Sequence, residues 1–233
     1  MLMRIKKTLN QFGYDVKKYR DTFSTTVLPI NIQTVLDIGA NTGKVARELR
    51  EMFPTAHIHS FEPLPSCFVK LEETMRGDTH FTAYNIALGE TDGDMMIEES
   101  SFHPSSSLLP MTALHKKLYP KSAGSVQKKI KVKRLDDVMR GTELSENIFI
   151  KMDVQGFEDH VIRGGSEVVK RASVIQIETA FVTLYEGQPL FDDIYRLLSG
   201  LGFAYYGDVG RHYSPETGKL IYEESLFIKK ELV

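Results

Sequence analysis

The sequence predicts an α/β domain built on a mainly parallel β-sheet with helices on both faces. Apolar segments typical of buried strands alternate with segments of helical spacing from residue 34 onward. The 233 residues suffice for one sizeable domain with an ample core. Because such sheets bind ligands beyond the carboxyl ends of their strands, the residues that follow each strand are the functional candidates.

The first half contains three apolar segments that we expect to be buried strands. They are TVLDI (34–38), HIHSFE (57–62) and FTAYNIAL (81–88). Helices are expected between them, at residues 43–52 and 66–76. Glycines then flank a turn into a further segment, DMMIEE (94–99).

The second half continues the alternation and closes with a hairpin. Strands are expected at QKKIKVKRL (127–135, half-exposed), NIFIKMDV (147–154), SVIQIET (173–179), FAYYGDV (203–209) and EESLFIKKE (223–231). Helices are expected at 157–169, interrupted at Gly164 and Gly165, and at 190–202.

Two segments stand apart from this rhythm. Residues 1–30 are predicted to form an N-terminal helical extension that ends at Pro29, which leaves 31–233 as the main domain. Within that domain, residues 100–133 begin with a Ser/Pro-rich stretch of little clear period. We expect them to form an inserted cover segment, because long irregular segments in compact domains tend to be functional or mobile.

The composition excludes several other classes of protein. Apolar residues make up 42% and charged residues 26%, and the formal charge of −2 gives no global attraction to nucleic acid or anionic membranes. The single cysteine, Cys67, excludes an intramolecular disulfide and a cysteine-based zinc site, and it fits a reducing cytoplasm. We find no secretory signal and no apolar run near the ~18 residues of a transmembrane helix, so we expect a cytoplasmic protein.

The first strand runs into a glycine turn, LDIGANTGKVARELR (36–50). A dinucleotide site needs glycines where Asn41 and Lys44 stand, and a side chain at 41 would obstruct a pyrophosphate. The phosphate-loop pattern also fails, because Gly39 and Gly43 are only four residues apart and Val45 follows Lys44. The pattern suits a nucleoside without phosphates, such as S-adenosylmethionine (SAM).

A SAM ligand would give three polar strand-end residues specific roles. Asp37 would hold the ammonium end, directly or through water. Glu62 would accept hydrogen bonds from the ribose hydroxyls, an interpretation we prefer to a solvated strand-end acid. Asn85 would contact adenine or its surroundings, although a turn-capping asparagine explains it nearly as well. The full predicted cofactor set is Asp37, Gly39, Ala40, Asn41, Gly43, Glu62, Pro63, Asn85 and Ala87.

Five segments in order make a more specific pattern: VLDIGANTGKVA, FEPLP, YNIALGETDG, IKMDVQGFE and VIQIE. Together they resemble the FkbM family of SAM-dependent methyltransferases, from about residue 33 to 180. The resemblance implies the class I methyltransferase Rossmann-like fold, with a seven-stranded, mostly parallel sheet and one antiparallel strand at the closing hairpin. It also implies O-methyl transfer, typically to hydroxyls of sugars, glycans or polyketide-type natural products. Gln155 departs from the family, which often has Glu there.

Methyl transfer from a sulfonium mostly requires that the acceptor oxygen is positioned and loses its proton. Asp153, at the end of a strand, is our leading catalytic candidate, although it also suits a helix cap. Glu158 and Glu178 are the other catalytic candidates. Three acids at one strand edge would make a possible Mg²⁺ site. His103 and His115, in the irregular segment, could also supply a base.

The acceptor is the least determined part. The serines of 105–109 could bond a sugar or be ordinary loop polarity. Residues 116–134 hold eight Lys or Arg and no acid, which could meet an acidic glycan, a phosphate-bearing acceptor or RNA, but a solvated basic strand face is simpler. Without an aromatic platform, nucleic acid is not expected.

Two other function classes remain as alternatives: a non-catalytic SAM-binding regulatory or assembly module, and an NAD-dependent sugar oxidoreductase. The second lacks the dinucleotide glycines. The oligomeric state is left open.

Overall fold

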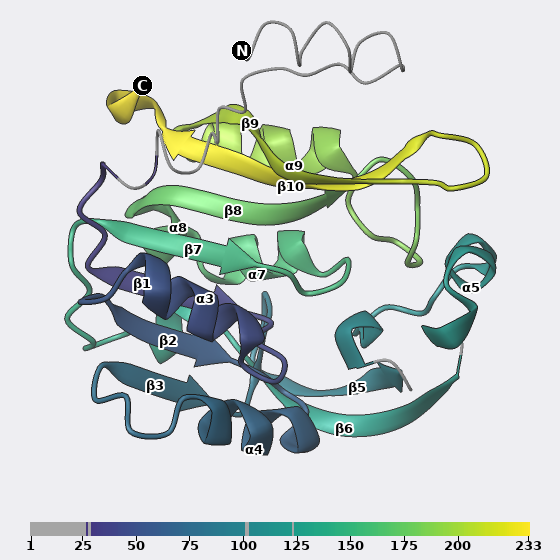
Figure 1. The fold of residues 1–233 in the computed structure, drawn as a ribbon, viewed down its shortest axis with the longest axis horizontal. Coiled ribbons are helices and arrows are strands. Elements are labelled where there is room, and N and C mark those ends of the chain that lie inside the picture. The colour runs from purple at the N-terminus through teal and green to yellow at the C-terminus, as the bar shows by residue number, and fades with distance from the viewer. Residues whose placement is uncertain (1–26, 28, 101–102, 123) are drawn as a thin grey trace, which may run out of the picture.

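The computed structural model describes residues 27, 29–100, 103–122 and 124–233. Within this part, the main sheet has seven strands and the order β3-β2-β1-β7-β8-β10-β9 (Figure 1). Their bounds are β3 Phe81–Tyr84, β2 His57–Phe61, β1 Thr34–Ile38, β7 Ile148–Met152, β8 Ala172–Ala180, β10 Leu220–Lys229 and β9 Phe203–Tyr213. Strand β10 runs antiparallel to both of its neighbours, β8 and β9, and the other strand pairs of this sheet are parallel. The predicted seven-stranded sheet with one antiparallel closing strand is confirmed.

Helices cover both faces of this sheet. Successive strand residues point to opposite sides, so an apolar strand has apolar side chains on both faces that helices can bury. Val35 packs in one apolar cluster with Leu49 of α3 (Lys44–Met52). Leu36 packs in the other, which contains residues of α7 (Glu158–Gly164), α8 (Ser166–Lys170) and α9 (Phe191–Gly200). Helix α4 (Pro65–Thr74) packs against α3 and the edge strand β3. No helix of the described residues is long and apolar enough to span a membrane.

The predicted strand over 81–88 is wrong as a single element. Strand β3 ends at Tyr84, and Ala87–Leu88 form β4, which belongs to a different sheet. The chain changes direction at Asn85, whose side-chain amide donates to the carbonyls of Glu62 (2.9 Å) and Pro63 (3.1 Å). These bonds tie the turn to the end of β2, so the continuous apolar pattern conceals a crossing between two sheets.

The second sheet has the order β4-β6-β5, with β5 at Gly93–Ser100 and β6 at Ser125–Lys133. The half-exposed strand predicted from the basic alternation is confirmed, since Ile130 and Val132 are buried between exposed lysines. Between β5 and β6 lie the 3-10 helices η1 (His103–Ser105) and η2 (Pro120–Ser122), with α5 (Ala113–Leu118) between them. In Figure 1 this segment lies beyond the carboxyl ends of the central strands.

The remaining elements follow the sequence closely. The predicted interruption of the 157–169 helix is confirmed, because Gly165 separates α7 from α8. A short helix not anticipated from the sequence, α6 (Leu135–Val138), follows β6. The predicted N-terminal helix lies almost entirely outside the described residues.

Candidate functional site

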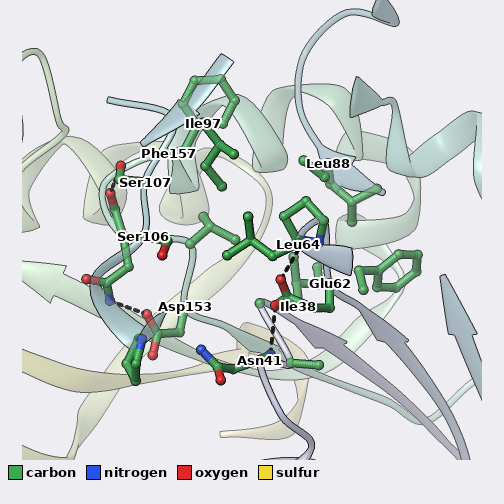
Figure 2. A pocket seen from close by; sticks show the side chains of 18 of the residues that line it. Ile38, Asn41, Glu62, Leu64, Leu88, Ile97, Ser106, Ser107, Asp153 and Phe157 are labelled. Atoms are coloured by element: carbon green, nitrogen blue, oxygen red, sulfur yellow. Dashed lines mark hydrogen bonds between the residues drawn. The ribbon is translucent and has the colours of Figure 1, made fainter. Parts of the chain in front are cut away.

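A cavity of about 270 Å³ lies at the carboxyl ends of β1, β2 and β7 (Figure 2). The glycine turn forms one wall, and the loop after β7 forms another. Much of the remaining lining is apolar: Ile38, Phe61, Leu64, Ile86, Leu88, Ile97, Leu108 and Phe157. A mostly apolar hollow with a few polar groups is typical of a small-molecule site.

Position 39 requires a glycine, both for its backbone conformation and for the space around it. Its φ of +87° is in the left-handed region that favours glycine, and a Cβ there would lie 1.9 Å from the backbone oxygen of Asp153. Its amide donates to the Phe61 carbonyl at 3.0 Å. Asn41 also has a positive φ, of 49°, and its side-chain oxygen accepts from the Thr42 amide. The turn after β1 is therefore packed directly against the ends of β2 and β7.

Glu62 joins the glycine turn to the end of β2. Its two carboxylate oxygens accept from the backbone amides of Asn41 (2.9 Å) and Leu64 (2.8 Å), as the dashed lines in Figure 2 show. Burial raises the pKa of Glu62 to about 7, although both backbone bonds act in the opposite direction. Each oxygen keeps a further lone pair, and Glu62 lines the cavity.

Asp37 lies beneath this surface. It is buried, accepts from the Ser60 hydroxyl at 2.9 Å, and is not among the residues that line the cavity. Burial raises its pKa to about 6, which the Ser60 bond and the charge of Lys151 partly offset. Its predicted contact with the ammonium end of SAM would therefore pass through water.

The other predicted cofactor residues divide into two groups. Most of them line the cavity: Gly39, Ala40, Asn41, Pro63 and Ala87. Gly43 and Asn85 do not. Gly43 is the N-cap of α3, and the amide of Asn85 braces the β2 end as described above. A contact between Asn85 and adenine remains a prediction.

Asp153 follows β7 and is partly exposed toward the cavity. Its Oδ1 accepts from the side-chain amide of Gln155 at 2.6 Å, and the Lys151 ammonium lies 3.9 Å from Oδ2. Burial raises the pKa of Asp153, and the charge of Lys151 opposes that rise. The hydrogen bond from Gln155 therefore orients the Asp153 carboxylate, while its burial and the charge of Lys151 set its pKa.

Asp153 also belongs to a group of acids. One carboxylate oxygen each from Asp153, Glu178 and Glu224 lies within 4.8 Å of the others. Burial, followed by the charges of Asp153 and Glu158, holds the pKa of Glu178 well above its ordinary range. The predicted meeting of Asp153 with Glu178 is observed, but the third acid of the group is Glu224, not Glu158.

Glu158 is directed elsewhere. Its Oε1 accepts from the backbone amides of Val154 (3.2 Å) and Gly156 (3.1 Å), so it closes the loop between β7 and α7. It is buried, and burial raises its pKa to about 7. A carboxylate engaged in this way supports the shape of the site, and its predicted catalytic role remains untested.

Sequence reasoning missed Lys151 and Glu224. Lys151 is buried in the apolar strand IFIKM, and its ammonium lies 3.0 Å from Glu224 Oε2. Burial disfavours the charged form, but the charges of Asp153 and Glu224 hold the pKa of Lys151 above its ordinary range. Because a lysine is unusual inside a buried apolar strand, its presence could have identified Lys151 as a candidate site residue. Glu224 could be found only from the register that pairs it with Glu178.

Gln155 connects Asp153 to the cover segment. Its φ of +54° is unusual for a residue with a side chain. Its side-chain oxygen accepts from the Tyr185 hydroxyl at 2.7 Å, and its backbone oxygen accepts from the Ser107 hydroxyl at 2.6 Å. Ser107 in turn bridges to Glu98 of β5. The loop of Asp153 is therefore fastened to the segment between β5 and β6.

The candidate bases and the basic run have ordinary explanations in the structure. His115 is buried in α5 between the rings of Tyr119 and Tyr185, with Nε2 3.0 Å from the Ser122 hydroxyl. The side chain of His103 lies outside the described residues. Several lysines of β6 pair with acids of β5 or of the turn before it, in the pairs Lys128–Glu99, Lys129–Asp94 and Lys133–Asp92. These pairs favour the simpler reading of a solvated strand face.

Comparison with known proteins identifies the family of this chain. The profile of the Methyltransferase FkbM domain matches residues 37–205. The 2-O-methyltransferase NoeI of Sinorhizobium fredii (strain NBRC 101917 / NGR234) is 27% identical over 208 residues, which cover 81% of this chain and 82% of that protein. Methyltransferase sdnD of Sordaria araneosa is 25% identical over 197 residues, with 70% and 71% covered.

The fold has a relative among solved structures. Methyltransferase FkbM from Methylobacillus flagellatus KT matches with a TM-score of 0.51 and 15% identity, over 85% of this chain and 44% of that one. This chain therefore spans less than half of that relative's length, and the likeness concerns the fold. Since the family profile matches well over half of the chain, the chain belongs to the FkbM family of SAM-dependent methyltransferases.

Proposed function

We propose that this chain transfers the methyl group of SAM to a hydroxyl of a sugar, glycan or natural-product acceptor. The observation that carries the proposal is the position of Asp153, whose side chain belongs both to the cavity lining and to the acid group. A carboxylate between two such regions is suited to act between donor and acceptor. The name of the relative NoeI, a 2-O-methyltransferase, supports oxygen as the atom that is methylated.

The cavity residues fit SAM chemically. Glu62 keeps acceptor capacity for the ribose hydroxyls, while Leu64 and Ile86 supply apolar surface that suits adenine. The methionine portion would lie against the glycine turn beside Asn41, which lines the cavity, and Asp37 would reach the ammonium end through water. The predicted cofactor residues keep these roles in the proposal.

The chain's own contribution is orientation and proton removal. When bound, SAM would supply an electrophilic methyl carbon on a sulfur that is neutral once the methyl group has been transferred. Asp153 accepts the hydroxyl proton, while the hydrogen bond from Gln155 fixes the direction of its carboxylate. Glu178, whose pKa burial raises, is a second proton acceptor within reach of Asp153.

We propose that the reaction does not need Mg²⁺. The Lys151 ammonium already lies 3.0 Å from Glu224 and 3.9 Å from Asp153, so a divalent cation among these acids would meet a buried positive charge. We expect dialysis against EDTA to leave the methyl-transfer rate unchanged. Loss of activity that added Mg²⁺ restores would contradict this.

The decisive experiment measures cofactor binding and transfer separately. Calorimetry should detect SAM binding and no comparable NAD binding, and mass spectrometry should detect a gain of one methylene in glycans or extracts incubated with SAM. In Asp153→Asn we expect SAM binding to persist and transfer to fall by about 100-fold or more. Asp94→Asn, an exposed acid of β5, is the matched control. Binding of NAD without SAM would overturn the proposal.

The second candidate is a SAM-binding regulatory or assembly module without catalysis. Binding of SAM with no methylated product in any extract would favour it. We keep the remaining predictions as part of the proposal: a catalytic unit at 31–233, a helical extension at 1–30, a cover at 100–133, and a cytoplasmic location.

A further inference from the structure

Two acids and one lysine beside Asp153 have hydrogen-bonding capacity beyond the removal of the acceptor proton. Glu178, Glu224 and Lys151 lie on three adjacent strands, β8, β10 and β7, and we call them the acceptor triad. The side chain of Glu224 is 26% exposed and that of the adjacent Asp153 is 35% exposed, so these two acids are open to a ligand, with Lys151 buried beneath them. Through Asp153 it borders the cavity proposed for SAM.

The triad offers both acceptors and a donor. The Glu178 carboxylate, which is partly exposed, receives no hydrogen bond from the described residues. The Glu224 Oε2 accepts from the side-chain amide of Gln176 at 3.1 Å, which leaves Oε1 available. The buried Lys151 ammonium lies 3.0 Å from Glu224 Oε2, and its three N–H donors have no other hydrogen-bond partner among the described residues.

A row of rings lies along the same side. His212 stacks on Tyr222, with centroids 4.8 Å apart and planes at 9°, and Tyr119 lies 5.9 Å from His212. His115 continues the row from Tyr119 to Tyr185. Tyr222 is two residues before Glu224 on β10 and therefore shares its face of the sheet. Partly exposed rings beside polar groups give apolar surface for the carbon face of a ligand.

We propose that the acceptor triad and the rings of Tyr119 and Tyr222 form a subsite that binds adjacent hydroxyl groups of a neutral sugar. The carboxylates of Glu178 and Glu224 accept from the hydroxyl hydrogens, and Lys151 donates to a hydroxyl oxygen. The sugar ring lies against the aromatic side chains, with one hydroxyl directed to Asp153. This inference rests on the proposed function and names its acceptor class.

Charge decides between neutral and charged ligands. The ammonium of this group, Lys151, already lies 3.0 Å from the Glu224 carboxylate, so the group has no spare positive charge for a phosphate or a sugar acid. A divalent cation would be attracted by the acids but would lie next to Lys151, whose positive charge is already enclosed. A neutral hydroxyl-rich ligand satisfies the acceptors and the donor together.

The test measures sugar binding without turnover. Protein saturated with S-adenosylhomocysteine is titrated with methyl glycosides of neutral hexoses and 6-deoxyhexoses, with methyl glucuronide and glucose 6-phosphate as anionic counterparts. We expect at least one neutral glycoside to bind and the anionic compounds not to. Glu224→Gln and Glu178→Gln should each weaken that binding by about tenfold or more and leave SAM affinity within about twofold.

Glu167→Gln, an exposed acid of α8, is the control and should change neither affinity. Thermal unfolding checks that each variant folds. If wild-type protein binds SAM but no neutral glycoside at about 10 mM, the subsite proposal is overturned while the proposed function stands. Tight Mn²⁺ binding that Glu224→Gln abolishes would also overturn it, in favour of a cation. Absence of SAM binding would instead contradict the proposed function.

Discussion

Gln155 is the residue at which the geometry of the site is most constrained. It holds a positive φ, its amide donates to Asp153, and its side-chain oxygen accepts from Tyr185. A residue kept in a sparsely populated conformation persists only when its surroundings fix it. Here three contacts do so, since Ser107 also donates to its backbone oxygen.

Gln155→Glu tests this residue through the pH dependence of methyl transfer. A second carboxylate beside Asp153 would remove a donor and add a like charge, and both effects raise the pKa of Asp153. We expect the acidic limb of the kcat profile to move upward by about one pH unit or more. The exposed Gln127→Glu is the control. A lower kcat with an unshifted profile would assign Gln155 a purely structural role.

At this scale, the sequence predicted residues whose position depends on short-range chain geometry. Gly39 and Glu62 flank strand ends, so their meeting at one edge follows from the parallel order of the strands. Glu224 and Tyr185 were missed, because their place depends on the register of a hairpin and on a loop path. No local pattern encodes either of these.

Among the elements, α7 and the turn before β5 come into unusually close contact. A Cβ on Gly164, the last residue of α7, would lie 1.9 Å from the backbone oxygen of Gly89. Because Gly89 follows β4, this contact joins the main sheet's helical layer to the second sheet. Strand β4, whose Ala87 lines the cavity, is placed by it.

Gly164→Ala should therefore lower the free energy of unfolding, by about 2 kcal/mol or more, because the methyl group would displace backbone. Gly200→Ala is a matched control at the last residue of α9, where a Cβ would meet nothing within 4 Å. It should be neutral or stabilising by up to ~1 kcal/mol. Urea denaturation measures both. Equal stabilities would show that the contact relaxes without cost.

The elements show where sequence patterns end. Buried parallel strands such as TVLDI have continuous apolar runs, and the bounds expected for β1 agree with those observed. The run FTAYNIAL has the same character but serves two sheets, because the change occurs at one asparagine with a side-chain bond to distant carbonyls. Periodicity records burial and does not record which sheet a strand joins.

At the scale of the whole molecule, the buried acid Glu158 makes the free energy of unfolding depend on pH. Burial raises the pKa of Glu158 from 4.5 to about 7, so the unfolded chain releases this proton first as pH rises. The contribution of the neutral acid is full below pH 4.5 and is lost between about 4.5 and 7. Compared with Glu158→Gln, the wild type should lose up to roughly 3 kcal/mol across that window.

Urea denaturation of both proteins at pH 4.5, 6 and 7.5 measures this difference. Glu48→Gln, an exposed acid of α3, controls for the loss of a surface charge. A difference that stays constant over the range would contradict an elevated pKa at Glu158.

The overall architecture was predictable because it follows from the alternation of strands and helices together with a family pattern spread over five segments. The second sheet was not, although its β6 strand was. Of its partners, β4 is a two-residue segment inside an apolar run that continues from β3, and β5 is a largely exposed strand, so neither has a distinct apolar signal of its own. Weak elements of this kind are specified by tertiary pairing.

The contact between Gly39 and the backbone oxygen of Asp153 bears on how such an enzyme can diversify. The loops after β1 and β7 are so closely packed there that a change in the backbone of one requires a change in the other. The segment between β5 and β6 and the β9–β10 hairpin take no part in this contact, so a change in either would leave it intact. New acceptors would therefore be gained by exchanging these outer parts while the two loops keep their contact.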